Sequence, residues 1–365
     1  MGTGASTYDK ESFGFKDEIA DAVTASFPGL DGKVVAVTGC STGLGLEVAK
    51  TAALKNARMI LMLNRRSQRS TAAEDAVREV VNSSGSPSEV RTVECDLQSL
   101  SSTRSAAASV SDIVQPLGGL DVLANNAGIM AMPDRRTADG YEVQMQTNQL
   151  SHVLLTKLLF PQLEAAAASR GEARVAFHSS GARQGPSSNL RPEFFRKSEA
   201  GSLGGDHQRW YLEMMFGSGG PWQRYHQTKL ANASFAMALH DKLQERGSKV
   251  KAVSADPGLA TTELQARSVD SGLMPASFAN FLFKNVKGQT PRDGAMDFAQ
   301  ACFGGDTESG DFFMPENGST GAPKKTISGG VPVVRGQESL VVSQVWINVS
   351  FESLRVFCPS TSLGL

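Results

Sequence analysis

Short runs of apolar residues alternate along the chain with longer segments in which apolar residues recur every three or four positions. Segments with helical periodicity include residues 46–56 and 141–168. The apolar runs that we interpret as buried strands are residues 33–38, 58–63, 89–95, 120–124, 174–178 and 249–254. Strands that alternate with helices in this way predict an α/β fold, with a doubly wound parallel sheet covered on both faces.

Two regions interrupt this alternation. Residues 181–222 form a long stretch rich in glycine, arginine and aromatic residues, without a clear regular element. Such a length inside a compact domain is usually functional or disordered. After about Gly304 the pattern loosens, and a final apolar segment, residues 340–357, is expected to be a packed terminal element. We therefore predict one main domain over residues 31–305 with an insertion at 181–222, an N-terminal extension over 1–30 and a C-terminal extension over 306–365.

Composition narrows the class of partner. The formal net charge of the 365 residues is -1, and no basic face for nucleic acid is evident. The four cysteines lie far apart, so neither a metal site nor a disulfide framework is indicated. No run approaches the ~18 to 20 apolar residues of a transmembrane segment, and the N-terminus does not resemble a secretory signal. We expect a soluble, cytoplasmic protein that binds a small molecule.

A glycine-rich turn follows the first predicted strand. Residues 38–45 read Thr-Gly-Cys-Ser-Thr-Gly-Leu-Gly and open the first main helix. Glycines at Gly39, Gly43 and Gly45 allow a tight turn, close approach of a pyrophosphate, and close packing of helix on strand. The phosphates then lie at a helix N-terminus, where free amides favour negative charge. Cys40 within this turn is interpreted as an inert filler.

The end of the second strand indicates which dinucleotide binds. An acidic residue there binds the ribose diol of NAD, whereas an arginine accommodates the 2′-phosphate of NADP. The chain has Asn64, Arg65 and Arg66 at this point and no acid. We therefore expect Arg65, supported by Arg66, to contact the phosphate, and NADPH to be preferred over NADH.

A tyrosine and a lysine four residues apart, Tyr225 and Lys229, lie on one face of a predicted helix. Neither titrates near neutral pH alone, since the free groups have pKa values near ~10 and ~10.4. A neighbouring ammonium favours the phenolate, so we expect Lys229 to lower the pKa of Tyr225. With the glycine turn, this pair predicts hydride chemistry on a nicotinamide.

Taken together, these segments resemble the short-chain dehydrogenase/reductase superfamily, and among its members the retinol-dehydrogenase-like proteins most. The resemblance covers roughly residues 32–304 and implies a Rossmann fold in a single domain. The family's motifs occur in order: Thr38 to Gly45, Asp96-Leu97, Asn125-Asn126-Ala127-Gly128, Asn148, Ser179-Ser180, Tyr225 to Lys229, and Pro257-Gly258 with Thr262.

The resemblance implies a catalytic set. Tyr225 would be the general acid in reduction and the base in the reverse direction, and Lys229 would lower its pKa and hold the nicotinamide ribose. Ser180, rather than the adjacent Ser179, would donate a hydrogen bond to the substrate oxygen. Asn148 would position a water in a proton relay to Lys229. His178 is interpreted as a packed residue of a buried strand.

The same resemblance implies a cofactor-binding set for NADP(H) and no metal. Asp96 would meet the adenine edge, Asn125 and Gly128 the ribose, and the Pro257-Gly258 turn the carboxamide. The full set is Gly39, Ser41, Thr42, Gly43, Leu44, Gly45, Asn64, Arg65, Arg66, Asp96, Leu97, Asn125, Ala127, Gly128, Tyr225, Lys229, Pro257, Gly258 and Thr262.

The chain departs from the smaller family members in the long gap between Ser180 and Tyr225. Larger relatives carry such an insertion as a substrate lid. Its apolar residues suit a bulky hydrophobic substrate such as a retinoid, steroid or aldehyde, although a small packed cluster beneath a loop would look the same. These residues are Trp210, Tyr211, Leu212, Met214, Met215, Phe216 and Trp222.

Two other functions fit the same motifs. A light-dependent protochlorophyllide reductase-like enzyme uses the same cofactor and Tyr/Lys pair, but typically has cysteine where this chain has Asn125. A non-catalytic NADP-binding scaffold or sensor would be expected to lose the catalytic set, which is complete here. The apolar side of residues 141–168 is compatible with a homodimer, or with packing on the protein's own sheet.

Overall fold

A computed structural model describes residues 14–185, 189–206, 219–262, 280 and 288–326. Its centre is an eight-stranded sheet in the order β3-β2-β1-β4-β5-β6-β7-β8. All neighbouring strands are parallel except β7 and β8. The strands are β1 (Val34–Thr38), β2 (Met59–Asn64), β3 (Glu89–Glu94), β4 (Val122–Asn125), β5 (Ala173–His178), β6 (Val250–Ala255), β7 (Phe312–Pro315) and β8 (Pro323–Thr326).

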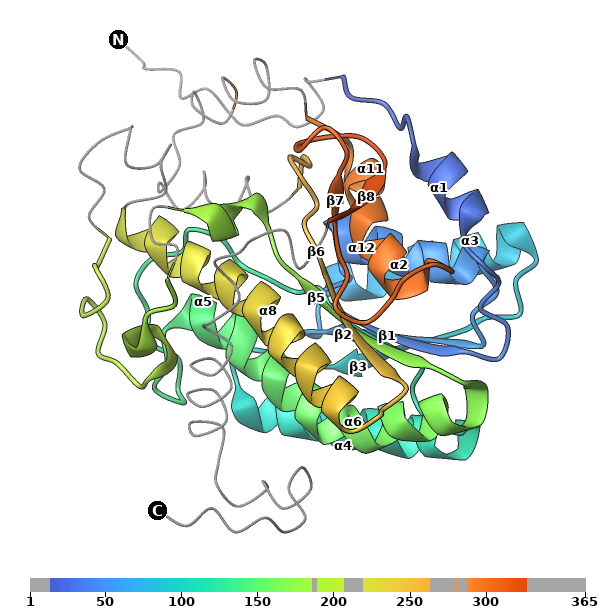
Figure 1. Cartoon of the computed structure of the whole chain (residues 1–365), viewed down its shortest axis with the longest axis horizontal. Coiled ribbons are helices and arrows are strands. Elements are labelled where there is room, and N and C mark those ends of the chain that lie inside the picture. The colour runs from blue at the N-terminus through green and yellow to red at the C-terminus, as the bar shows by residue number, and fades with distance from the viewer. Residues whose placement is uncertain (1–13, 186–188, 207–218, 263–279, 281–287, 327–365) are drawn as a thin grey trace.

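Helices cover both faces of the sheet (Figure 1). One face carries α4 (Leu100–Val114), α6 (Ser151–Arg170) and α8 (Gly220–Glu245), and the other carries α1 (Ala20–Ser26), α2 (Gly43–Leu54), α3 (Gln68–Ser84) and α12 (Met296–Phe303). The shorter helices are η2 (Gln115–Leu117), α5 (Val143–Met145), η3 (Gln146–Leu150), η4 (Gly181–Gln184), η5 (Pro192–Phe195) and α11 (Pro291–Gly294). The predicted doubly wound α/β fold is confirmed.

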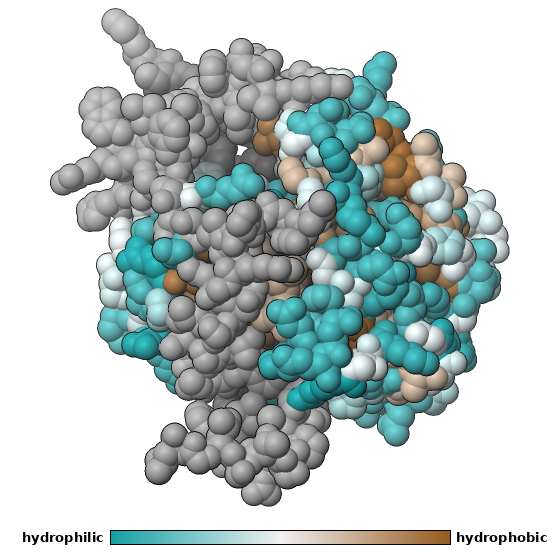
Figure 2. Space-filling view, in the orientation of Figure 1, coloured by the Kyte–Doolittle hydropathy of each residue, from teal (hydrophilic) through white to brown (hydrophobic). Residues whose placement is uncertain are grey.

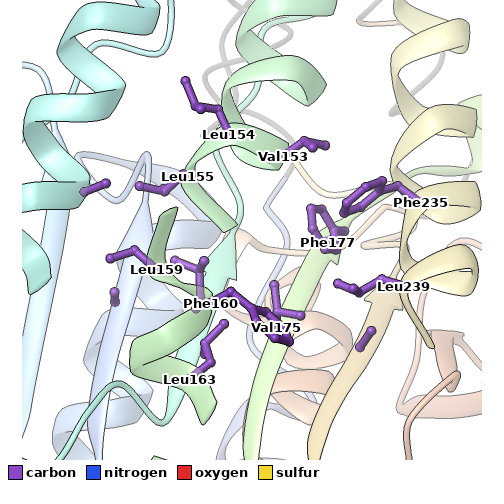
Figure 3. Packing of buried hydrophobic residues seen from close by; sticks show 14 of the residues in the cluster. Val153, Leu154, Leu155, Leu159, Phe160, Leu163, Val175, Phe177, Phe235 and Leu239 are labelled. Carbon is purple, nitrogen blue, oxygen red and sulfur yellow. The ribbon is translucent and has the colours of Figure 1, made fainter. Parts of the chain in front are cut away.

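Each face of the sheet has its own hydrophobic core. Between α6, β5 and α8, leucines and phenylalanines interdigitate (Figure 3), and the rings of Phe177 and Phe235 meet edge to face with centroids 5.2 Å apart. The apolar side chains of α6, including Leu155 and Leu159, are buried in this core. The apolar stripe predicted for residues 141–168 therefore faces the protein's own sheet.

The described surface is mainly polar, as the teal areas of Figure 2 show for one face. Among the described residues, Leu54 is the one large apolar side chain classed as exposed. None of the described helices combines the length and apolarity needed to cross a bilayer.

The order of the strands reverses direction at β1, which pairs with β2 on one side and with β4 on the other. Helices leaving these two strands go to opposite faces, so a crevice forms beyond their carboxyl ends. The residues that follow β1, β2, β4, β5 and β6 all converge at this edge. This is where an open α/β sheet binds its ligand.

Two features were not predicted from the sequence. Strands β7 and β8 lie beyond residue 305 and belong to the same sheet, which reaches Thr326. They were missed because each has only four residues and β8 carries exposed lysines. The helix expected over 141–168 is interrupted, since η3 is a π-helical turn between α5 and α6. The apolar segment 340–357 lies outside the described residues.

Candidate active site

A cavity of about 510 Å3 lies at the carboxyl edge of the sheet. It extends from the arginines after β2, past the glycine turn, to Tyr225 and Lys229 on α8. The predicted site residues that line it are Gly39, Ser41, Thr42, Gly43, Leu44, Gly45, Asn64, Arg65, Arg66, Asp96, Leu97, Ala127, Gly128, Tyr225, Lys229, Pro257 and Thr262. Asn125, Asn148, Ser180 and Gly258 are not among the lining residues.

The glycine turn is closely packed. Gly39 has φ 65°, and a Cβ there would lie 2.7 Å from the Cα of Ala127. A Cβ on Gly45 would lie 2.7 Å from the carbonyl oxygen of Gly39. Helix α2 begins here, and the side chain of its N-cap residue, Thr42, makes no capping hydrogen bond. The first amides of α2 are therefore available to an anion in the cavity.

Three arginines line the end of the cavity that lies farthest from Tyr225 and Lys229. Arg65, Arg66 and Arg69 all line it, the last from the first turn of α3. Arg66 pairs with Glu94 at 3.2 Å on the surface, whereas Arg65 has no ion-pair partner among the described residues. This group can hold a phosphate monoester. Arg69 was not predicted, although its spacing of four from Arg65 was a usable signal.

The two asparagines after β4 have different environments. Asn125 is fully buried, and its amide donates to Thr156 of α6 at 3.1 Å. Asn126 instead lines the cavity and donates to the carbonyl of Thr38 at 2.9 Å. The structure thus places Asn126 in the position expected of Asn125, because successive side chains leaving a strand point to opposite sides.

Tyr225 is 4 % exposed and faces the cavity. Burial strongly raises the pKa of its hydroxyl, a hydrogen bond with Ser180 lowers it, and the charge of Asp256 raises it further. The expectation that the pKa of Tyr225 is lowered is therefore wrong for this structure. The reason is that burial outweighs the opposing effect of the hydrogen bond with Ser180.

Lys229 lies beside the tyrosine, with its Nζ 5.7 Å from the centre of the Tyr225 ring. The ammonium donates to the carbonyl of His178 at 3.0 Å. Burial lowers the pKa of Lys229 to about 8, against the opposing effect of Asp256. The lysine can therefore change charge in the physiological range.

The two consecutive serines after β5 contact different groups. Ser180 hydrogen bonds the Tyr225 hydroxyl, while Ser179 lines the cavity and donates to the backbone carbonyl of Lys229 at 2.9 Å. Next to them, His178 stacks on Phe298 with ring centroids 4.5 Å apart. Burial holds the pKa of His178 well below its ordinary value, so the ring is neutral.

Asn148 lies within η3 and is fully buried. Its carboxamide oxygen accepts from the amide of Ile129 at 2.8 Å, and its nitrogen donates to Ile129 at 2.9 Å and to Thr228 at 3.0 Å. Asn148 thereby joins the loop after β4 to the helix that carries Tyr225. Cavity-lining residues that the sequence did not reveal include Gln98, Asn126, Ile129, Thr147, His178 and Ser179.

The described part of the insertion packs against the main core. Leu190, Phe194, Phe195 and Leu203 are buried there. Trp222 stands edge-on to the ring of Tyr225, with centroids 6.3 Å apart. The other aromatic and apolar residues predicted for the lid, Trp210 to Phe216, lie outside the described residues.

Thiol and metal chemistry have no support in the described part of the chain. Burial raises the pKa of Cys40 to about 12, so this thiol stays protonated, as expected of a filler. Within that part, no group of three or more His, Cys, Asp or Glu side chains is placed to hold a metal ion.

Comparison with known proteins shows which family the chain resembles. Residues 33–191 match the short chain dehydrogenase family. Retinol dehydrogenase 13 of Mus musculus is 32% identical over 275 residues, which cover 74% of this chain and 72% of the mouse protein. A crystal structure of an uncharacterised protein from Mycobacterium paratuberculosis superposes with a TM-score of 0.63 at 28% identity, covering 89% of this chain and 96% of that one.

A further solved structure carries a cofactor in its description. It is a short chain dehydrogenase from Burkholderia cenocepacia in complex with NADP, with a TM-score of 0.55 at 19% identity. The superposition covers 80% of this chain and 98% of the Burkholderia chain. At this identity the likeness concerns the fold alone.

Proposed function

The chain belongs to the short-chain dehydrogenase/reductase family of oxidoreductases, and from this premise we propose that it uses NADP(H) to interconvert a lipophilic carbonyl compound and its alcohol. The observation that carries the proposal is one continuous cavity, which joins the glycine turn and the arginines after β2 to Tyr225 and Lys229. A dinucleotide would occupy the cavity along its whole length. A substrate would occupy only the part of the cavity beside Tyr225.

The chain's residues fit NADP(H) in three places. The amides at the start of α2 would bind the pyrophosphate, and the missing Cβ atoms of Gly39 and Gly45 let the turn pack closely against Ala127 and Asn126. Arg65, with Arg66 and Arg69 nearby, would bind the 2′-phosphate, where NAD-binding proteins carry an acid. At the other end, Lys229 would hold the nicotinamide ribose. The Burkholderia structure, crystallised with NADP, has the same fold.

The proton chemistry belongs to Tyr225 and its neighbours. When bound, reduced nicotinamide supplies a hydride to the carbonyl carbon. The buried Tyr225 is fully protonated at neutral pH, and its hydroxyl would give its proton to the carbonyl oxygen. Ser180, which already contacts that hydroxyl, would donate a hydrogen bond to the same oxygen as negative charge develops there. Lys229, with a pKa of about 8, can hold a proton close to the phenol.

The expected substrate is bulky and apolar. Trp222 lies against the ring of Tyr225, and the described part of the insertion is anchored by buried phenylalanines. The mouse relative is named for its action on retinol, an apolar alcohol. We infer a retinoid, steroid or fatty aldehyde as the substrate class.

The test is NADPH consumption with retinal, steroid ketones and aliphatic aldehydes, in light and in darkness. We expect Tyr225→Phe to abolish turnover while NADPH still binds, because only the transferable proton is lost. Tyr141→Phe, a matched change at another buried tyrosine, should keep the wild-type rate. A Tyr225→Phe enzyme that retained most of its rate would rule out this proton donor, and activity only under light would favour ring reduction.

A further inference from the structure

A buried ion pair lies behind the catalytic tyrosine. Arg183 of η4 and Asp256, which follows β6, are 1 % and 3 % exposed and meet at 2.8 Å. Neither residue lines the cavity, and neither belongs to the set of residues implied by the sequence motifs. Each one also bonds the backbone of a segment that does border the reaction centre.

The pair connects two loops. Arg183 donates to the carbonyl of Ser180 at 3.1 Å, and so fixes the backbone of the serine that contacts Tyr225. The other oxygen of Asp256 accepts from the amide of Gly258 at 3.0 Å. Gly258 has φ 61°, and its neighbour Pro257 lines the cavity. The ion pair therefore sets the position of the serine loop relative to the Pro257-Gly258 turn.

This arrangement is poorly explained by stability alone. Two nitrogens of Arg183, Nε and one terminal nitrogen, have no hydrogen-bond partner among the described residues. Its guanidinium lies 4.3 Å from the centre of the Phe312 ring, an apolar surface. Burying charges costs more than a pair with incomplete hydrogen bonding usually returns, and an apolar replacement is often as stable. A role in the reaction gives such a pair another reason to exist.

We propose that Arg183 and Asp256 are positioning residues, which hold Ser180 and the Pro257-Gly258 turn in register beside Tyr225 and Lys229. This inference rests on the proposed function, because a positioning role for the ion pair requires a reaction at Tyr225. The geometry of the pair itself does not depend on it.

Besides Arg183, three titratable groups among the described residues are influenced by the charge of Asp256. Lys229 of α8 is cationic and gains from the aspartate, whereas the Tyr225 hydroxyl loses acidity to it. Asp297 of α12 faces the same region, but burial and Asp256 raise its pKa well above the ordinary value, so it is neutral. His178 of β5 is neutral as well, because burial lowers its pKa. From α8, the ring of His226 contacts the carbonyl of Ala182 in η4.

Removing the negative charge and removing the positive charge should therefore shift the pH dependence of the reaction in opposite directions. In Asp256→Asn the negative charge is gone, so the pKa values of both Tyr225 and Lys229 should fall. In Arg183→Met the aspartate is left uncompensated, so both should rise. We expect the pH profile of kcat/KM for carbonyl reduction to shift by about one pH unit, down in the first variant and up in the second.

The double variant Arg183→Met/Asp256→Asn separates charge from folding. It removes both charges and should return the pH profile to near the wild-type position, even if kcat falls because the two loops are no longer joined. A matched control is Arg174→Met, which breaks the pair with Glu172 at the other end of β5 and should leave the profile unmoved. If both single variants shift the profile in the same direction, or not at all, the proposal is overturned.

A second readout does not require turnover. The ammonium of Lys229 can be titrated by NMR after reductive 13C-methylation, with Lys229→Ala identifying its signal. Its pKa should fall in Asp256→Asn and rise in Arg183→Met. If the wild-type protein reduces no carbonyl compound, the proposed function fails, but this titration still tests the ion pair. An unchanged lysine pKa in both variants overturns the inference whatever the activity.

Discussion

At the scale of single residues, burial has more influence on the site than neighbouring charge. The spacing of Tyr225 and Lys229 correctly brings them to one cavity, but the buried phenol is less acidic than a free tyrosine. The sequence could not show this, since burial depends on elements far away along the chain. The same holds for Asn126, whose place at the cavity depends on how β4 ends.

Arg65 lines the cavity without an ion-pair partner among the described residues, and we propose that it selects the cofactor. We predict that Arg65→Glu lowers the preference for NADPH over NADH by ten- to a hundredfold. The reason is that a charge-assisted hydrogen bond contributes about 1.5–3 kcal/mol, and the new carboxylate repels the 2′-phosphate. Steady-state kinetics with both cofactors measure the ratio.

Arg58→Glu is the matched control for that prediction. It makes the same charge change next to the start of β2, at the opposite end of the strand from the cavity. Its cofactor preference should equal that of the wild type. An unchanged preference in Arg65→Glu would move the phosphate contact to Arg66 or Arg69.

At the scale of elements, helix α8 carries Tyr225 and Lys229 to the cavity. Arg224, next to Tyr225, is fully buried and lies near three acids: Glu142 at 3.3 Å, Asp206 at 3.4 Å and Asp134 at 3.6 Å. It also donates to the carbonyls of Gly205 and Met132. One side chain thus ties α8 to the insertion and to the loop after β4.

We predict that Arg224→Met destabilises the protein by about 3–5 kcal/mol, because it leaves buried acids without their cation. Urea unfolding with and without the change measures the difference. Arg191→Met, which removes an exposed pair with Glu193, should alter stability by no more than about 1 kcal/mol. Equal effects of the two changes would show that Arg224 does not hold these segments together.

The elements themselves were largely predictable. The six strands identified from apolar runs all occur, each within two residues of its expected ends. Fully buried strands such as β2 produce such runs because both faces are covered. The π-helical turn η3 gave no signal, because its backbone is set by contacts such as the hydrogen bonds of Asn148 to Ile129, far away in sequence.

At the scale of the whole molecule, distant segments are joined through buried polar groups. The Asp293 carboxylate of α11 accepts hydrogen bonds from the amides of Glu18, Ile19 and Ala20, and so fixes the start of α1. At the carboxyl end of β1, the ring of His152 lies between the Thr38 hydroxyl and the carbonyl of Asn148, 2.9 Å from each. These contacts have no sequence signature, because each partner is an ordinary residue until the chain has folded.

The His152 ring also predicts how the fold responds to acid. A carbonyl can only accept, so Nδ1 carries the proton toward Asn148, and Nε2 accepts from Thr38. Burial lowers the pKa of His152 to about 4, from its ordinary value of 6.5. Below pH 6.5 the unfolded chain takes up a proton that the folded protein refuses. Stability should therefore fall by about 3 kcal/mol between pH 6.5 and pH 4, since each pKa unit corresponds to about 1.4 kcal/mol.

Urea unfolding across this pH range measures the effect. In His152→Gln the protein should be less stable at pH 7, because the contacts to Thr38 and Asn148 change, but its loss of stability below pH 6.5 should be smaller than in the wild type. His240→Gln, at a half-buried histidine of α8, should keep the full wild-type slope. If the slope were the same in all three proteins, acid sensitivity would have to come from other groups, and the neutral ring between β1 and η3 would not be what limits the fold at low pH.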